Sequence, residues 1–233
     1  RKNLVWLFFT AIVASAIQYS LTFTGLKGLD AGIAALIVQL EVPFLVILGA
    51  LLLAERPQPR QWVGIAVAFI GVALIANPST FNGSLVPVAL VIGGAMSWAL
   101  GQIMVRRMKA ISGLTVTAWT AVFAAPQLFV MSALFENGQV EAVQQAQPIV
   151  WVAVAYLGIV MTAFGYFLWN TLIRRHDVGR VAPFLLLLPL YASLGGMFFL
   201  GERPTVISII GGAIILFGVG IITIQRRART AED

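Results

Sequence analysis

The sequence predicts an all-α integral membrane protein with eight transmembrane helices, which we expect to be part of a ten-helix architecture of two inverted five-helix repeats (5+5). Three observations predict this fold. First, 60% of the residues are hydrophobic and 10% are charged, and the mean hydropathy is +0.94, far from the composition of a soluble domain. Second, the apolar residues fall into stretches that are long enough to cross a bilayer. Third, the chain matches itself when it is shifted by 147 residues.

The apolar stretches follow one another with short links that carry most of the charge. A spanning helix needs ~20 residues to cross ~30 Å of hydrocarbon, and the third stretch is the short one. The predicted spans cover residues 4–25, 31–54, 61–76, 85–105, 114–135, 149–173, 181–200 and 206–224.

The basic residues of the links predict the orientation. With a cytoplasmic N-terminus, only Lys27 and Arg203 lie outside. The inner side collects Arg1, Lys2, Arg56, Arg60, Arg106, Arg107, Lys109, Arg174, Arg175, Arg180, Arg226, Arg227 and Arg229. Since cytoplasmic loops carry the excess of Lys and Arg, this bias predicts a multi-pass membrane protein with both ends cytoplasmic. Anionic membrane lipid accounts for the basic balance, so no nucleic-acid partner is expected.

The self-match keeps one register over about 60 residues. It aligns Tyr19 with Tyr166, Asp30 with Asp177, Gly64 with Gly211, Gly71 with Gly218, and the run 55–57 (Glu-Arg-Pro) with 202–204. The first Glu-Arg-Pro follows the second span and lies inside, whereas the second follows the seventh span and lies outside. The two copies therefore cross the membrane in opposite senses, which is typical of secondary transporters.

The repeat also predicts how the chain is divided. Spans four and five have no counterpart among the preceding spans, so we expect two further helices, roughly 60 residues, before Arg1 in a parent of about 300 residues. The predicted units are a partial first repeat over residues 1–78, a second repeat over 84–226 and a cytoplasmic tail over 227–233. The first unit then contains helices 3–5 of the ten-helix fold, and the second contains helices 6–10.

These residues resemble the EamA-type transporters of the drug/metabolite transporter superfamily. The resemblance covers essentially the whole chain and rests on Ala-Glu-Arg or Gly-Glu-Arg at the end of the fourth helix of each repeat and on a glycine-rich fifth helix. Within the family the chain is most similar to bacterial exporters of cysteine and O-acetylserine. That similarity is carried by the stretches 31–39, 55–75, 97–101, 165–172 and 180–189. It implies a secondary active exporter of small metabolites, amino acids or their derivatives, working by alternating access in a bacterial inner (plasma) membrane.

Glu41 is the one ionisable residue deep in a predicted span. Ten residues after Ala31 it lies ~15 Å along its helix, near the membrane midplane. A carboxylate there costs on the order of 2.5 to 3.5 kcal/mol, so Glu41 is a candidate proton carrier or a counter-charge for a substrate ammonium. The alternative is a glutamate that only joins two helices. Exporters of the kind resembled are expected to have a neutral residue at this position.

Pro43 lacks a backbone N–H, so we expect the carbonyl of Gln39 one turn earlier to be free and the turn to be loosened. Pro183 and Pro189 interrupt the equivalent helix of the second repeat, and breaks in corresponding helices indicate a transporter site. A tolerated kink is the alternative, because proline is common in membrane helices.

Further polar residues recur on helical faces of the first, fourth and sixth spans. The candidate substrate-binding residues are Gln18, Tyr19, Gln39, Glu41, Trp98, Gln102, Tyr166, Trp169 and Asn170. Beside Trp98, a stripe formed by Gly93, Ser97 and Gly101 predicts close helix contact. Trp169 and the two tyrosines fit an interfacial aromatic belt as well.

The sequence lacks the residue patterns that other classes of function require. The chain contains one histidine, no cysteine and no recognisable hydrolase, metalloprotease or ATP-binding motif, so we expect neither an enzyme nor a cofactor. The expected partners are a small-molecule substrate and membrane lipid, while the oligomeric state stays open. The alternatives are an exporter of other amphiphilic metabolites or drugs from the same superfamily, a non-coupled channel, and a membrane scaffold.

Overall fold

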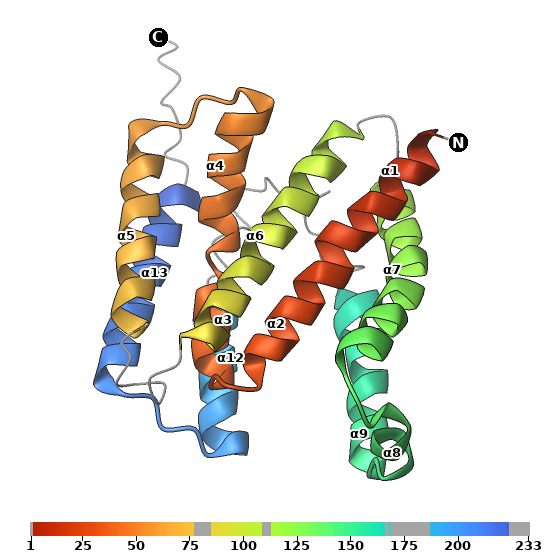
Figure 1. Cartoon of the computed structure of the whole chain (residues 1–233). Coiled ribbons are helices and arrows are strands. Elements are labelled where there is room, and N and C mark those ends of the chain that lie inside the picture. Colours follow the sequence, from red (N-terminus) through yellow and green to blue (C-terminus); the bar gives the residue numbers. More distant parts are fainter. Residues whose placement is uncertain (1, 77–84, 109–112, 166–167, 169–186, 224–233) are drawn as a thin grey trace.

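The structure is a computed structural model that describes residues 2–76, 85–108, 113–165, 168 and 187–223. All regular structure in these residues is helical (Figure 1). The helices are α1 (Lys2–Ala11), η1 (Ile12–Ile17), α2 (Gln18–Leu26), α3 (Ala31–Val38), α4 (Glu41–Leu53), α5 (Pro59–Ile75), α6 (Val86–Arg107), α7 (Gly113–Phe135), α8 (Gln139–Gln144), α9 (Pro148–Ala155), η3 (Tyr156–Phe164), α12 (Leu188–Gly195), η5 (Gly196–Leu200) and α13 (Val206–Thr223). The segments η1, η3 and η5 are π-helical.

The all-helical membrane fold is confirmed for the described residues. Five helices there are long and apolar enough to span a membrane, and they cover Leu4–Leu26, Ala31–Leu53, Val86–Arg107, Thr115–Phe135 and Val206–Thr223. The three remaining predicted spans coincide with shorter apolar helices over Pro59–Ile75, Pro148–Thr162 and Leu188–Leu200. Eight complete crossings and a 5+5 repeat stay predictions.

The turns after α4 and η5 have the same backbone geometry. Ala54 and Gly201, which are 147 residues apart, both take the left-handed conformation, with φ of 54° and 69°. The N–H of the next residue then turns back onto the helix: Glu55 donates to the Gly49 carbonyl at 3.2 Å and Glu202 to the Gly196 carbonyl at 3.0 Å. Such left-handed ends satisfy carbonyls that a helix terminus leaves unpaired. The two turns lie at opposite ends of the molecule in Figure 1.

Helices α5 and α13 pack antiparallel along their lengths (Figure 1). Their backbones meet at glycines, because a Cβ on Gly64 would lie 2.7 Å from the Gly218 carbonyl oxygen and one on Gly71 would lie 2.7 Å from that of Gly211. The pairing is crossed with respect to the sequence repeat, which aligns Gly64 with Gly211 and Gly71 with Gly218. Two copies related by a two-fold axis make contacts of this crossed kind.

The core lies where α3, α5, α6 and α13 meet. Its members are buried aliphatic side chains: Ile33, Leu36, Ile37, Leu40, Ala68, Val72, Ile75, Val88, Val91, Ala95, Ile215 and Val219. Helix α6 packs against η1 and α2 and also against α3 and α4. At the predicted inner face, Arg106 Nη1 pairs with Glu55 Oε1 at 3.0 Å and Arg107 Nη2 donates to the Leu52 carbonyl at 2.9 Å. These contacts tie the C-terminal ends of α4 and α6 together.

We call the contact of Gly64 and Gly71 with Gly218 and Gly211 the glycine seam. It predicts that one added methyl group strongly lowers the stability of the protein. In Gly71→Ala the new Cβ meets the backbone of α13, which cannot yield as a side chain would, so we expect a loss of about 1 to 3 kcal/mol. The melting temperature in detergent should then fall by ~2 to 4 °C for each kcal/mol. Gly195→Ala in α12 is the matched control, because a Cβ on Gly195 would meet no other side chain or helix of the described residues within 4 Å. Equal melting of the two variants would contradict the seam.

Candidate functional site

The described candidate residues lie on three membrane spans that pack together. Gln18 and Tyr19 begin α2, Gln39 and Glu41 flank the junction of α3 with α4, and α6, which packs against all of these helices, carries the other two. The two candidates on α6 are Trp98 and Gln102. They lie on the same helical face as Val91 and Ala95, which belong to the core shared with α3. The candidates Tyr166, Trp169 and Asn170 lie outside the described residues.

Close packing of η1 and α2 against α6 depends on the predicted stripe of small residues, which is confirmed. A Cβ on Gly101 would lie 2.8 Å from Ala14 Cα, and one on Gly93 would lie 3.3 Å from Leu21 Cδ1. Gly94, which the predicted stripe did not include, also lies at this contact, since a Cβ there would lie 3.2 Å from the Gln18 carbonyl oxygen. Between these glycines, the hydroxyl of Ser97 donates to the Val13 carbonyl at 2.7 Å. The stripe therefore brings the backbone of the first span close to α6.

A π-helical segment precedes Gln18 and widens the first span. It covers Ile12–Ile17, and a shift of 147 residues places these positions within η3, the π-helical segment Tyr156–Phe164. Such segments are rare and occur often at functional sites. These segments could not be predicted from the sequence, because nothing in the residues of η1 marks a departure from an ordinary α-helix.

Gln18 and Tyr19 point in different directions. The side chain of Gln18 is buried at 8% exposure, and its Nε2 donates to Thr22 Oγ1 at 3.4 Å. Tyr19 is 43% exposed, and its ring stacks on that of Phe23 with the centroids 5.7 Å apart. Gln18 therefore faces the packed contact with α6, whereas Tyr19 faces away from it.

The second span is broken at Gln39 and Leu40, as predicted, but the expectation of a free Gln39 carbonyl is wrong. That carbonyl accepts the N–H of Val42 at 3.2 Å, and the N–H of Leu40 donates to Ile37 at 3.0 Å. The break tightens into bonds between residues three apart, which is a common way to satisfy groups at helix ends. The Gln39 carbonyl therefore already accepts a hydrogen bond within its own turn.

Glu41 is the first residue of α4 and is partly buried. Its neighbours Leu40 and Pro43 are buried as well. Within the described part of the chain, no hydrogen bond or ion pair to this carboxyl is found. The groups that remain to interact with this carboxyl are a substrate, a proton or a segment outside the described residues.

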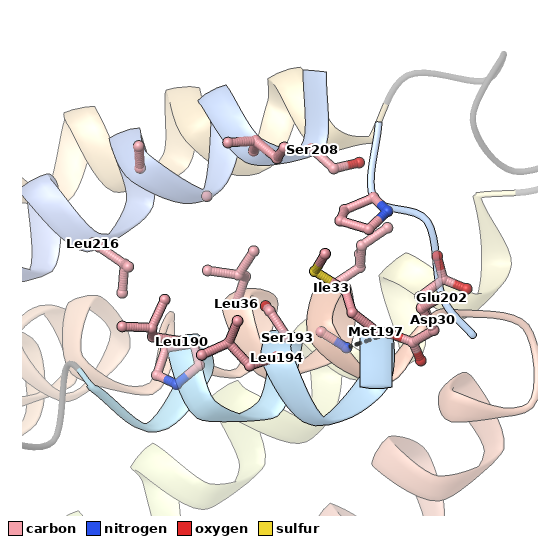
Figure 2. A pocket seen from close by; sticks show the side chains of 16 residues that line it. Asp30, Ile33, Leu36, Leu190, Ser193, Leu194, Met197, Glu202, Ser208 and Leu216 are labelled. Carbon is pink, nitrogen blue, oxygen red and sulfur yellow. Dashed lines mark hydrogen bonds between the residues drawn. The ribbon is translucent and has the colours of Figure 1, made fainter. Parts of the chain in front are cut away.

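A separate cavity of about 330 Å³ lies between α3, α12 and α13 (Figure 2). Its wall is mainly apolar and includes Ile33, Leu36, Leu190, Leu194, Met197 and Leu216. The hydroxyls of Ser193 and Ser208 also line it. None of the described candidate substrate residues lines it, so sequence reasoning missed this cavity. It is made by helices from opposite ends of the chain, and no local motif marks it.

Two carboxylates stand at one end of the cavity, where Figure 2 shows Asp30 beside Glu202. Glu202 accepts the backbone N–H of Ala31 at 2.6 Å through Oε1 and that of Gly32 at 3.3 Å through Oε2. Partial burial, together with repulsion from Glu202, raises the pKa of Asp30 above its ordinary value. The described residues contain no cluster of three or more His, Asp or Glu side chains that could hold a metal ion.

The family profile for EamA-like transporters matches residues 1–77 and 85–224. The chain belongs to the EamA-like transporter family. This membership makes it a transporter rather than an enzyme, and together with its apolar helices it makes the chain a multi-pass membrane protein.

Three of the similar proteins are named as efflux pumps or exporters. The chain is 29% identical to a probable amino-acid metabolite efflux pump of Escherichia coli over 230 residues, with 94% of this chain and 77% of that protein covered. It is 32% identical to a protein of the same name from Salmonella typhimurium, with 91% and 74% covered. It is 30% identical to a probable terminal-alkyne amino-acid exporter of Streptantibioticus cattleyicolor, with 87% and 67% covered.

A solved crystal structure has a similar fold. It aligns with a TM-score of 0.62, covers 98% of this chain and 78% of its own, and is 21% identical in sequence. At that identity the likeness concerns the fold alone.

The raised pKa of Asp30 predicts how its replacement acts. Since the folded state holds this carboxyl's proton more tightly than the unfolded state, its ionisation costs stability, and the cost grows as the pH rises through the titration range. Asp30→Asn should therefore melt at a slightly higher temperature than the parent at pH 7 and at an equal temperature at pH 3, where the Asp30 carboxyl of the folded parent is protonated. Glu141→Gln, on the exposed helix α8, is the control. A lower melting temperature for Asp30→Asn at pH 7 would contradict the repulsion.

Proposed function

We propose that this chain is a secondary active exporter of small metabolites, in particular amino acids or their derivatives, that works by alternating access. The names of the relatives support a small-metabolite exporter. Within that class, cysteine and O-acetylserine are the narrower proposal, which rests on the resemblance of the sequence. A bacterial inner membrane with both ends in the cytoplasm is the proposed setting, supported by the distribution of basic residues.

The observation that best supports alternating access is the crossed glycine seam of α5 and α13. Gly64 meets Gly218 and Gly71 meets Gly211, as expected of two inverted halves of the chain. In transporters built this way, one half rocks against the other around a central site. The proposed halves are the first repeat, 1–78, and the second repeat, 84–226, with 227–233 as a cytoplasmic tail.

The proposed substrate site is lined by residues of the first, second, fourth and sixth spans. Its members are Gln18, Tyr19, Gln39, Glu41, Trp98, Gln102, Tyr166, Trp169 and Asn170. Amide and aromatic groups suit a small amphiphilic solute, because they supply hydrogen bonds beside apolar surface. The packing of η1, α2, α3 and α4 around α6 supports this grouping for the described members other than Tyr19, whose ring faces away from α6.

Proton antiport through Glu41 is the proposed driving reaction. Glu41→Gln keeps the size and one accepting oxygen but cannot titrate. Proton-gradient-driven efflux should then fall close to the leak rate of protein-free vesicles, while substrate exchange at equal pH should survive. Radiolabelled amino acids loaded into proteoliposomes report both rates. Glu55→Gln, which changes an exposed carboxyl of the inner turn, is the matched control and should keep both.

Other roles of Glu41 give other outcomes. A carboxylate that pairs with a substrate ammonium predicts loss of exchange as well as efflux in Glu41→Gln. A structural Glu41 predicts normal rates in the Gln variant and a low yield of folded protein for Glu41→Ala. Wild-type efflux in Glu41→Gln would remove this residue from the driving reaction.

A non-coupled channel is the alternative from another class. A carrier saturates with substrate and responds to an imposed pH gradient, because each cycle moves a fixed number of solutes and protons. A channel shows neither property at low concentration. If efflux of the radiolabelled amino acids rises linearly with their concentration and does not depend on the pH gradient, the protein is a channel and not an exporter.

A further inference from the structure

The two equivalent glutamates, Glu55 and Glu202, have the same backbone setting but different partners. Each follows a left-handed residue and donates its N–H to a glycine carbonyl six residues earlier. Each carboxylate also folds back over that glycine, since a Cβ on Gly49 would lie 2.6 Å from Glu55 Oε2, and one on Gly196 would collide with the carboxylate of Glu202. At the predicted inner face, Glu55 pairs with Arg106 and both side chains are about half exposed, at 49% and 48%.

Glu202 instead holds the start of α3. Its two oxygens accept the N–H groups of Ala31 and Gly32, which lie 171 and 170 residues away in the sequence. These N–H groups have no partner within the helix, because the first turn of a helix leaves its donors unpaired. Asp30, at the N-cap, makes no side-chain cap hydrogen bond, so Glu202 supplies the cap from the opposite end of the chain. Charge-assisted bonds of this kind are the stronger ones, and the helix dipole adds to them.

The contact sits where α3 and α12 touch. A Cβ on Gly32 would lie 2.9 Å from Ser193 Oγ and 3.0 Å from Ser193 Cα, so only a glycine lets α3 come this close. Figure 2 shows Asp30 and Glu202 at one end of the cavity, with Ser193 further in and Leu190 and Leu216 towards the other end. The carboxylate bridge therefore joins the two helix ends that border the cavity on the predicted outer side.

We propose that Glu202 is the outer latch of the transporter: it closes the outer end of the cavity between α3, α12 and α13 by binding the start of α3, and its release opens that cavity to the outer solution. This proposal rests on the proposed function, because a carrier that works by alternating access must close its outer side in part of its cycle. Asp30 carries a second carboxylate beside the latch, and its repulsion with Glu202 keeps the closed contact weak enough to open.

A single introduced thiol reports the opening, because the chain contains no cysteine. Ser193→Cys is nearly isosteric and lies at the contact of α3 with α12. Adding Glu202→Gln removes the charge and one of the two acceptor oxygens. Since bonds to a charged group contribute more than neutral ones, the rate of labelling by a membrane-impermeant maleimide from the outside should rise by about tenfold. The measurement uses right-side-out vesicles that contain the whole protein.

Two further variants of the Ser193→Cys protein keep the test sharp. Asp30→Asn removes the repulsion and should slow labelling, which is opposite to the effect of Glu202→Gln and cannot come from general unfolding. Glu136→Gln is the matched control, since it changes another outer carboxylate, paired with Lys27 at 3.5 Å, and should leave the rate unchanged.

The latch is overturned if Glu202→Gln leaves the labelling rate unchanged, or if Glu136→Gln raises it equally. It is also overturned if Asp30→Asn speeds labelling. Labelling requires no substrate, so its failure is distinct from failure of the exporter. A protein that shows the labelling pattern but no saturable efflux keeps the latch and loses the proposed function, whereas efflux without the pattern keeps the function and loses the latch.

Discussion

Close backbone contact between α5 and α13 is the constraint on which the rest of the fold depends. Gly64 and Gly71 face Gly218 and Gly211 at distances that leave no room for a side chain. In a membrane, association of helices depends on close van der Waals packing, because lipid is as apolar as the helices themselves. The seam therefore binds the N-terminal and C-terminal parts of the chain, and α3 and α6 complete the core beside it.

Once α5 and α13 run antiparallel, the turns that precede them must lie at opposite ends of the molecule. Glu55 and Glu202 then act on opposite sides, although their backbones are alike. One carboxylate meets the basic end of α6, and the other meets the unpaired N–H groups of α3. The same local motif thus makes an exposed ion pair on one side and a helix cap on the other. In the proposed mechanism, Glu202 is the latch of the outer side, whereas Glu55 ties the ends of α4 and α6 together at the inner side.

Features set by composition and short-range pattern could be predicted from the sequence. The apolar spans, the break before Pro43 and the small-residue contact of Ser97 and Gly101 with η1 follow from such patterns. Features set by contacts between distant segments could not. The cavity, the cap that Glu202 places on α3 and the π-helical turn before Gln18 depend on how helices pack. The Gln39 carbonyl was predicted wrongly because a proline that removes one hydrogen bond also lets the turn tighten into another.

The central claim is that equivalent positions of the two repeats lie on opposite sides of the membrane. Arg56 and Arg203 are such positions, both exposed in turns, and single cysteines placed there are the only thiols in the chain. Labelling of intact cells with an impermeant maleimide tests the claim most directly. We expect Arg203→Cys to react from outside and Arg56→Cys to react only after the membrane is permeabilised. Reaction of both cysteines from the same side would contradict the inverted arrangement.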